Sequence, residues 1–211
     1  LNTVREFSAA ERYLRAGEWA KAPYRLTASL RNKVLGILGL GRIGKAIAKR
    51  GEAFGLKIAY CGRSQQANIA YPFYASPRAL AEACDILVIA APGGPQTRHL
   101  VNADVLHALG PQGFLINIAR GSLVDEAALI AALHARTIAG AGLDVFAQEP
   151  HFSKDFLTTP HTVLLPHVGS ASIETRQAME DLLIANVDAF AQGHPVLTPV
   201  PECVLAGLAA Q

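Results

Sequence analysis

The sequence predicts an α/β protein with a doubly wound parallel sheet that carries helices on both faces. Short apolar stretches typical of buried strands alternate along the chain with segments of helical periodicity. The first of these stretches, residues 33–40, runs into a glycine-rich turn that is followed at once by a helical pattern. With 211 residues, of which 51% are hydrophobic and 17% charged, the chain can bury one substantial core.

The glycine-rich turn has the sequence GLGRIG, which is the spacing of a dinucleotide-binding fingerprint. Gly39 would make the tight turn, Gly41 would let the backbone approach a pyrophosphate, and Gly44 would let helix and strand pack closely. The N–H groups at the start of the next helix would face the phosphates, so Arg42 and Ile43 are also predicted cofactor contacts. The alternative is an ordinary glycine turn after a buried strand. The strand before it and the helix after it favour a Rossmann-type sheet.

The remaining elements follow from the same periodicities. Residues 1–20 suggest one or two helices with an apolar stripe that Gly17 interrupts. Ser76 is placed to cap a helix whose first position is Pro77. Strands are expected at residues 56–60, 73–75, 85–91, 113–119, 138–145 and 163–165, and helices at 76–83, 105–109, 125–133 and 173–190.

Composition excludes several classes of function. The formal charge of +2 and the scattered lysines and arginines argue against a nucleic-acid partner. No apolar run is long enough to cross a bilayer, and the chain opens on Leu1 without a signal segment, so we expect no membrane partner and a cytoplasmic location. Cys61, Cys84 and Cys203 are odd in number and widely spaced, which favours reduced thiols over a disulfide framework or a metal site.

The end of the second strand bears on the choice of cofactor. NAD-specific proteins of this kind usually place a carboxylate there for the ribose 2′-hydroxyl. This chain has Arg63 and Ser64 instead, which could pair with a 2′-phosphate and donate a further hydrogen bond. We therefore expect NADP(H) to be preferred and NAD(H) to be possible. In the alternative interpretation Arg63 is a solvated turn residue, and the protein does not discriminate between the two.

Three side chains lie at or just beyond the carboxyl ends of later strands, where ligands bind in open α/β sheets: Arg120, Glu149 and His167. An arginine can hold a carboxylate through two parallel hydrogen bonds, and a histidine can exchange a proton near neutral pH. Together they predict reduction of a 2-oxo acid. The nicotinamide would give a hydride, His167 would protonate the carbonyl oxygen, Glu149 would support His167, and Arg120 would bind the carboxylate. Each residue alone also has an ordinary structural interpretation, and their joint occurrence behind the glycine turn favours the catalytic one.

The segments at residues 39–44, 116–126, 142–146 with the following Glu149, and 165–170 resemble the signatures of the D-isomer-specific 2-hydroxyacid dehydrogenases. The resemblance implies that Arg120, Glu149 and His167 are catalytic and that Asp144 contacts the nicotinamide carboxamide. The full set of predicted cofactor contacts is Gly39, Gly41, Arg42, Ile43, Gly44, Arg63, Ser64, Ala91, Pro92, Thr97, Ile118, Asp144, His167 and Gly169.

Residues 61–64 and 169–176 are most similar to the NADP(H)-preferring glyoxylate/hydroxypyruvate reductase branch of that family. The resemblance also implies a substrate-binding domain of the family that precedes the stretch present here. We therefore expect residues 1–25 to be an interdomain helix and dimer arm, 26–187 the dinucleotide-binding domain, and 188–211 a tail that returns to the substrate domain. Such a chain would bind NADP(H) but turn over poorly.

Two further expectations concern partners. The family resemblance implies a two-fold homodimer through the cofactor domains, with an arm at residues 11–23 and Trp19 reaching the neighbour. A rival function is a nicotinamide-dinucleotide-sensing interaction module, because corepressors related to this family keep the same three residues. The small net charge and the similarity to the reductases favour an oxidoreductase that acts on a small 2-oxo acid.

Overall fold

The computed structural model describes residues 1–200, so Cys203 and the end of the expected C-terminal tail lie outside the described residues. The chain divides into two compact units, Leu1–Pro166 and a second unit that begins at His167. The domain boundaries expected after residues 25 and 187 stay predictions.

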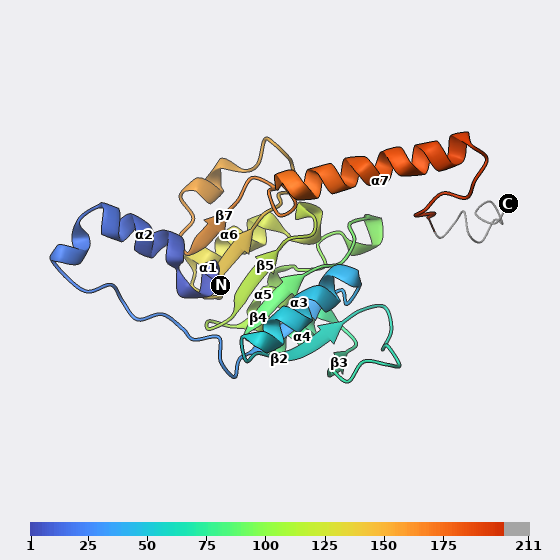
Figure 1. The fold of residues 1–211 in the computed structure, drawn as a ribbon. Helices are drawn as coiled ribbons and strands as arrows, with labels where there is room; N and C mark the ends of the chain where they lie inside the picture. Colours follow the sequence, from blue (N-terminus) through green and yellow to red (C-terminus); the bar gives the residue numbers. More distant parts are fainter. Residues whose placement is uncertain (201–211) are drawn as a thin grey trace. The chain divides into compact units, whose positions relative to one another are not determined.

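Seven parallel strands form the sheet of the first unit, in the order β3-β2-β1-β4-β5-β6-β7 (Figure 1). This order confirms the predicted doubly wound fold, because the chain starts at β1, builds outward to β3 and then returns to β1 to add β4. The strands are β1 (Val34–Leu38), β2 (Lys57–Cys61), β3 (Phe73–Tyr74), β4 (Ile86–Ile89), β5 (Phe114–Asn117), β6 (Gly140–Leu143) and β7 (Thr162–Leu164).

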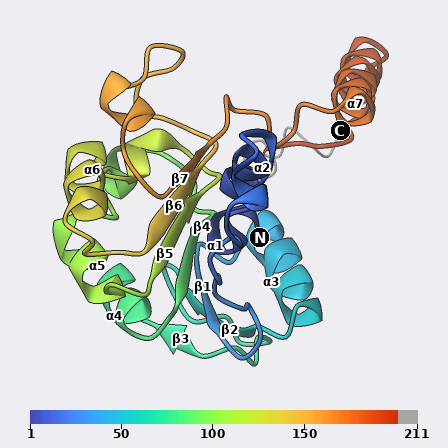
Figure 2. The same ribbon diagram turned by 90° about the vertical axis from the view of Figure 1, so that its left-hand side faces the viewer.

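Helices cover both faces of this sheet. Figure 2 shows α4, α5 and α6 on one face and α1 and α3 on the other. The helices of the first unit are α1 (Asn2–Arg5), α2 (Phe7–Arg15), α3 (Arg42–Ala53), α4 (Pro77–Glu82), α5 (Ala103–Leu109) and α6 (Glu126–His134), with short 3₁₀ turns η1 (Glu18–Ala20), η2 (Pro95–Thr97), η3 (Gly121–Leu123) and η4 (Lys154–Leu157).

Two apolar cores hold these layers together. On the face of α4, α5 and α6, fully buried leucines such as Leu80, Leu106 and Leu129 pack against the sheet. On the opposite face Ile37 and Tyr60 are completely buried beneath α3 and the N-terminal segment. Burying side chains on both faces explains why the strands read as continuous apolar runs rather than as alternating patterns.

Side-chain caps set where the sheet-covering helices begin. The Ser76 hydroxyl accepts a hydrogen bond from the Ala79 N–H, which confirms the predicted cap of α4. Asn102 and Asp125 cap α5 and α6 in the same way. Because of the Asn102 cap, α5 begins two residues before the predicted helix at 105–109.

Asp85 ties together the beginnings of the two central strands. Its carboxylate accepts a hydrogen bond from the Val34 N–H at 2.7 Å and another from the Lys33 ammonium at 3.0 Å. Burial would raise the pKa of Asp85, but these two donors outweigh it, so the pKa lies below its usual value. Both bonds lie where β1 and β4 begin, at the opposite end of the strands from the loops that follow them.

The N-terminal segment forms two helices separated by Gly17 from a 3₁₀ turn, as predicted. Val4 is buried in the core beside α3, whereas Phe7, Leu14 and Trp19 are at least half exposed. Residues 22–31 then run as an irregular arm to β1.

The described part of the second unit is dominated by one long helix, α7 (Ile173–Ala191), in agreement with the helix predicted at 173–190. The Ser172 hydroxyl caps it by accepting a hydrogen bond from the Thr175 N–H. No helix within residues 1–200 is both long enough and apolar enough to cross a membrane.

Cys61 and Cys84 are buried free thiols. Burial raises the pKa of both, that of Cys84 to about 12, so they stay protonated at neutral pH. Both act as small apolar side chains of the core.

Candidate functional site

The three glycines of the turn after β1 have different structural roles. Gly39 has a left-handed φ of 100°, and a Cβ there would lie 2.6 Å from the Ala91 nitrogen. A Cβ on Gly44 would lie 2.3 Å from the Gly39 carbonyl oxygen, so only glycine lets α3 approach the turn this closely. A Cβ on Gly41, in contrast, would have no atom within 4 Å. The glycine at 41 therefore leaves open space above the turn, as close approach by a ligand requires.

The first turn of α3 presents its backbone to that open space. Gly41 is the residue before the helix, and no side chain caps the helix start in the described structure. The first N–H groups of a helix have no partner within the helix, and they carry the positive end of its dipole. This is the arrangement that binds phosphate groups at helix N-termini.

A cavity of about 760 Å³ opens beside the helix start. Its lining joins the glycine turn to the loops that follow β4 and β5. The residues that line it are Gly41, Arg42, Ile43, Ala90, Ala91, Pro92, Gly93, Gly94, Ile118, Ala119, Arg120 and Ser122. The structure thus brings seven of the predicted site residues to one cavity: Gly41, Arg42, Ile43, Ala91, Pro92, Ile118 and Arg120.

The loop that carries Arg120 is shaped by Asn117, the last residue of β5. The Asn117 side chain is 1% exposed; its amide donates to the Arg120 carbonyl at 3.0 Å and accepts from the Ala119 N–H at 3.1 Å. Gly93 leaves room for the aliphatic part of Arg120, since a Cβ there would lie 3.0 Å from the Arg120 Cγ. Arg120 lines the cavity, and its guanidinium Nη1 donates a hydrogen bond to the Ala119 carbonyl at 2.6 Å.

Thr97 shapes the neighbouring loop. Its hydroxyl lies 2.9 Å from the Pro92 carbonyl, to which it donates, and its N–H donates to the Gly94 carbonyl. These bonds close the loop between Pro92 and Thr97 on itself. The predicted contact of Thr97 with a cofactor stays a prediction.

Arg63 and Ser64 are exposed in the turn that follows β2. Two bonds hold this turn beside the glycine turn: the Gly39 N–H donates to the Cys61 carbonyl, and the Gln66 side chain donates to the Leu40 carbonyl at 2.9 Å. Gln66 also donates its own N–H to the Tyr60 hydroxyl. The basic side chain at position 63 therefore stands one strand away from the start of α3.

Asp144 and Glu149 lie in the segment after β6. Asp144 is 6% exposed, and its N–H donates to the Asn117 carbonyl at 3.0 Å. The Glu149 carboxylate accepts a hydrogen bond from the Phe146 N–H at 2.8 Å. Both residues therefore follow the strand adjacent to the one that delivers Arg120.

His167 and Gly169 belong to the second unit. His167 has a left-handed φ of 55°, which is uncommon for a residue other than glycine. Within the first unit, Arg120 and Glu149 follow the neighbouring strands β5 and β6. That His167 converges with them stays a prediction.

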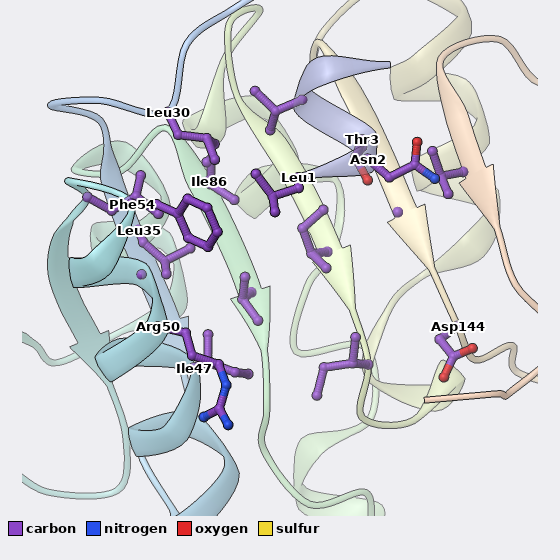
Figure 3. A pocket seen from close by; sticks show the side chains of 18 of the residues that line it. Leu1, Asn2, Thr3, Leu30, Leu35, Ile47, Arg50, Phe54, Ile86 and Asp144 are labelled. Carbon is purple, nitrogen blue, oxygen red and sulfur yellow. The ribbon is translucent and has the colours of Figure 1, made fainter. Parts of the chain in front are cut away.

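A second hollow, of about 350 Å³, lies on the sheet face that carries α1 and α3. Figure 3 shows the side chains of Leu1, Phe54 and Ile86 around it, from the N-terminus, the end of α3 and β4. Most of its lining is apolar. The lining runs along the sheet face and includes Ile118 and Asp144, two predicted cofactor contacts that follow β5 and β6. Such a groove offers no row of N–H donors for phosphates, so the candidate site is the cavity beside Gly41.

Sequence reasoning missed three residues that shape the site. Asn117 and Gln66 each hold a site loop through side-chain bonds to backbone, and Glu126 accepts a hydrogen bond from the Ala147 N–H. An asparagine at the end of an apolar run was a usable signal for Asn117, because asparagine side chains often bond to the backbone two or three residues on. Gln66 bonds to a residue 26 positions away in the sequence and Glu126 to one 21 positions away. No local sequence pattern predicts such distant contacts.

A parallel sheet with a switch point between β1 and β4, a glycine turn and an uncapped helix start together define a dinucleotide-binding α/β domain. Residues 1–169 match the D-isomer specific 2-hydroxyacid dehydrogenase, NAD binding domain. The chain belongs to this family, as its motifs indicated.

Similar proteins include the hydroxyphenylpyruvate reductase of Plectranthus scutellarioides and the glyoxylate/hydroxypyruvate reductase A of Arabidopsis thaliana, 46% and 48% identical over 200 residues. Each match covers 95% of this chain and 64% of the relative. The NADPH-dependent glyoxylate/hydroxypyruvate reductase of Sinorhizobium meliloti, solved with NADP and malonate, is 50% identical with a TM-score of 0.91, over 96% of this chain and 64% of that one. The chain thus spans about 64% of the length of these relatives.

The contrast between Gly41 and Gly44 yields a test of the turn. Gly44→Ala should lower the free energy of unfolding by about 2 kcal/mol or more, because the added methyl overlaps the Gly39 carbonyl. That corresponds to a fall in Tm of about 4–8 °C for a chain of this size. Gly41→Ala places its methyl in open space and should change Tm by less than about 2 °C. If thermal unfolding showed the same fall in Tm for Gly44→Ala and Gly41→Ala, the assigned packing of the two glycines would be wrong.

Proposed function

We propose that this chain is the cofactor-binding part of a reductase that converts a small 2-oxo acid to a D-2-hydroxy acid at the expense of NADPH. The observation that carries the proposal is the cavity in which the uncapped start of α3 and the Arg120 side chain share one lining. One end of that cavity suits phosphates, and the other offers a guanidinium for a carboxylate.

The residues present fit a nicotinamide dinucleotide. Gly41 leaves its Cβ position free, and Arg42 and Ile43 contribute backbone N–H groups at the helix start. Gly39 and Gly44 act by packing the turn, and Thr97 by closing the loop from Pro92. When bound, the reduced cofactor supplies a hydride.

A preference for the phosphorylated cofactor rests on the turn after β2. Arg63 and Ser64 are exposed there, and no carboxylate occurs among residues 62–66 to bind an unmodified ribose. The S. meliloti relative is described as NADPH-dependent and was solved with NADP. NAD(H) remains a possible second cofactor, because the glycine turn recognises the diphosphate that both share.

The chain's own residues would handle the substrate and the proton. Arg120 would bind the carboxylate of the 2-oxo acid through two parallel N–H···O bonds and polarise the adjacent carbonyl. His167 would donate a proton to the carbonyl oxygen as the hydride reaches the carbonyl carbon, which yields the hydroxyl. Glu149 would accept a hydrogen bond from the imidazole and favour its protonated form. Asp144 would contact the nicotinamide carboxamide, with Gly169 beside His167.

The substrate class follows from what Arg120 can recognise. The named substrates of the similar proteins range from glyoxylate and hydroxypyruvate to hydroxyphenylpyruvate, which share only the 2-oxo carboxylate. A guanidinium binds the carboxylate that these substrates share and makes no use of their variable side chains. Glyoxylate and hydroxypyruvate are therefore the substrates to test first. The rival sensing function gains no support from the three relatives described above, all of which are reductases.

Cofactor choice can be tested by titrating the chain with NADPH and with NADH. Arg63→Ala should weaken NADPH binding by about tenfold or more, because it removes a charge-assisted contact to the 2′-phosphate, and should leave NADH affinity within about twofold. Arg31→Ala is the matched control, since Arg31 precedes β1 at the opposite edge of the sheet. An unaltered NADPH-to-NADH affinity ratio in Arg63→Ala would refute the assignment.

Catalysis can be tested by following NADPH absorbance in single-turnover reactions with glyoxylate and hydroxypyruvate. The chain should oxidise NADPH, and Arg120→Lys should slow the reaction by about 100-fold, because lysine cannot reproduce the two-point contact. NADPH affinity should be unchanged, as Arg120 is placed at the substrate end of the cavity. If NADPH binds but a full-length version of the protein oxidises it with neither acid, the sensing function becomes the better account.

We also propose a homodimer that uses the N-terminal arm at residues 11–23. The exposed apolar side chains of Phe7, Leu14 and Trp19 support it, because large apolar groups gathered on one segment are typical of an interface. Light scattering should report twice the mass of the chain, and Trp19→Ser with Leu14→Ser should shift the equilibrium towards monomer. A monomeric wild-type chain at micromolar concentration would contradict the proposal.

A further inference from the structure

The segment after β6 carries two of the predicted site residues, Asp144 and Glu149, yet it has no regular secondary structure from residue 144 to the 3₁₀ turn η4. Something other than a strand or helix must therefore set its course. We propose that Glu126, at the start of α6, is a positioning residue that holds this segment in the geometry that reduction requires. This inference rests on the proposed function.

The contact itself is short and direct. The Glu126 carboxylate accepts a hydrogen bond from the Ala147 N–H at 2.7 Å, a bond that reaches 21 residues along the chain. A hydrogen bond from N–H to an ionised carboxylate is about twice as strong as one between neutral groups. Glu126 thus fastens the segment two residues before Glu149.

Glu126 is itself held on a rigid element. It is the first residue of α6, whose preceding residue Asp125 caps the helix by accepting from the Ala128 N–H. Leu129 and Leu133 of the same helix are completely buried against the sheet. A carboxylate on this base can fix the position of a loop, because its own backbone has little freedom.

Two further contacts fix the position of the segment after β6. The Glu149 carboxylate accepts a hydrogen bond from the Phe146 N–H, so adjacent N–H groups of the segment are taken by two different carboxylates. Gly121 packs on the same peptide: a Cβ there would lie 1.8 Å from the Phe146 carbonyl carbon and 2.2 Å from the Ala147 nitrogen. Gly121 is also the residue after Arg120. The peptide between residues 146 and 147 is thus the point where the Arg120 loop, α6 and the Glu149 segment meet.

The surroundings of Glu126 agree with this role. Burial raises the pKa of its carboxyl group, against the opposing effect of the Ala147 N–H. A half-buried carboxylate that served only to stabilise a helix start would be better placed in water. The bond to the segment offsets part of this desolvation.

The competing explanation is that Glu126 stabilises α6 as a negative charge near the positive end of the helix. The two roles respond differently to substitution. Glu126→Gln and Glu126→Ala both remove the charge, but glutamine keeps an oxygen that can accept from the Ala147 N–H. Positioning therefore predicts that glutamine rescues, whereas a dipole role predicts that both variants behave alike.

The test measures amide hydrogen exchange at residues 146–147 together with single-turnover NADPH oxidation, using the whole chain. Glu126→Ala should raise exchange at Ala147 by about tenfold and lower the turnover rate by about 10- to 100-fold, with NADPH affinity unchanged. Glu126→Gln should keep both within about threefold of the wild type. The matched control is Asp104→Ala, which removes a first-turn carboxylate from α5 that pairs with the exposed Arg78.

Several outcomes separate the explanations. Unchanged exchange at Ala147 in Glu126→Ala would overturn the proposal, and so would a loss of rate that glutamine fails to restore. If Asp104→Ala slowed turnover as much as Glu126→Ala, a general effect of helix stability would explain both. If a full-length version of the protein binds NADPH without oxidising it while the exchange results hold, the proposed function fails and Glu126 still positions the segment.

Discussion

The site depends on one close approach, that of the glycine turn to the end of β4. Gly39 lies against the backbone at Ala91 with no room for a Cβ, and Gly44 lies against the Gly39 carbonyl. These contacts occur at the switch point, where the chain order reverses and a crevice opens between neighbouring loops. Any side chain at either position would push α3 away from the sheet and move its first N–H groups. The position of these N–H groups, which we propose to bind phosphates, is therefore a consequence of packing.

The loops that carry the candidate functional side chains depend on bonds from side chains to the backbone. Asn117 turns the chain at the end of β5 so that Arg120 reaches the cavity, and Gln66 holds the turn that carries Arg63. Glu126 does the same for the segment of Glu149. In each case a loop without regular structure is fixed by one polar side chain that is anchored in a strand, a turn or a helix start. This explains how irregular segments can place functional groups with the accuracy that chemistry needs.

Much of the fold could be predicted because it depends on local patterns. Continuous apolar runs marked the inner strands β1, β4 and β6, which are buried on both faces. Ser76 with Pro77 marked the start of α4. The strands at 33–40, 85–91, 113–119 and 138–145 were predicted too long. β4 ends at Ile89 because its partner β1 stops where Gly39 turns away, a limit set by the neighbouring strand and absent from the run itself. The glycine turn and Arg120 were recognisable, whereas Gln66 and Glu126 were not, because their partners are remote in sequence.

The most direct test of this account is a crystal structure of the chain grown with NADPH. The account predicts diphosphate oxygens within hydrogen-bonding distance, about 3 Å, of the N–H groups of Arg42 and Ile43, with the 2′-phosphate beside Arg63. A dinucleotide bound elsewhere, for example in the apolar groove near Phe54, with the space above Gly41 left to solvent, would contradict it.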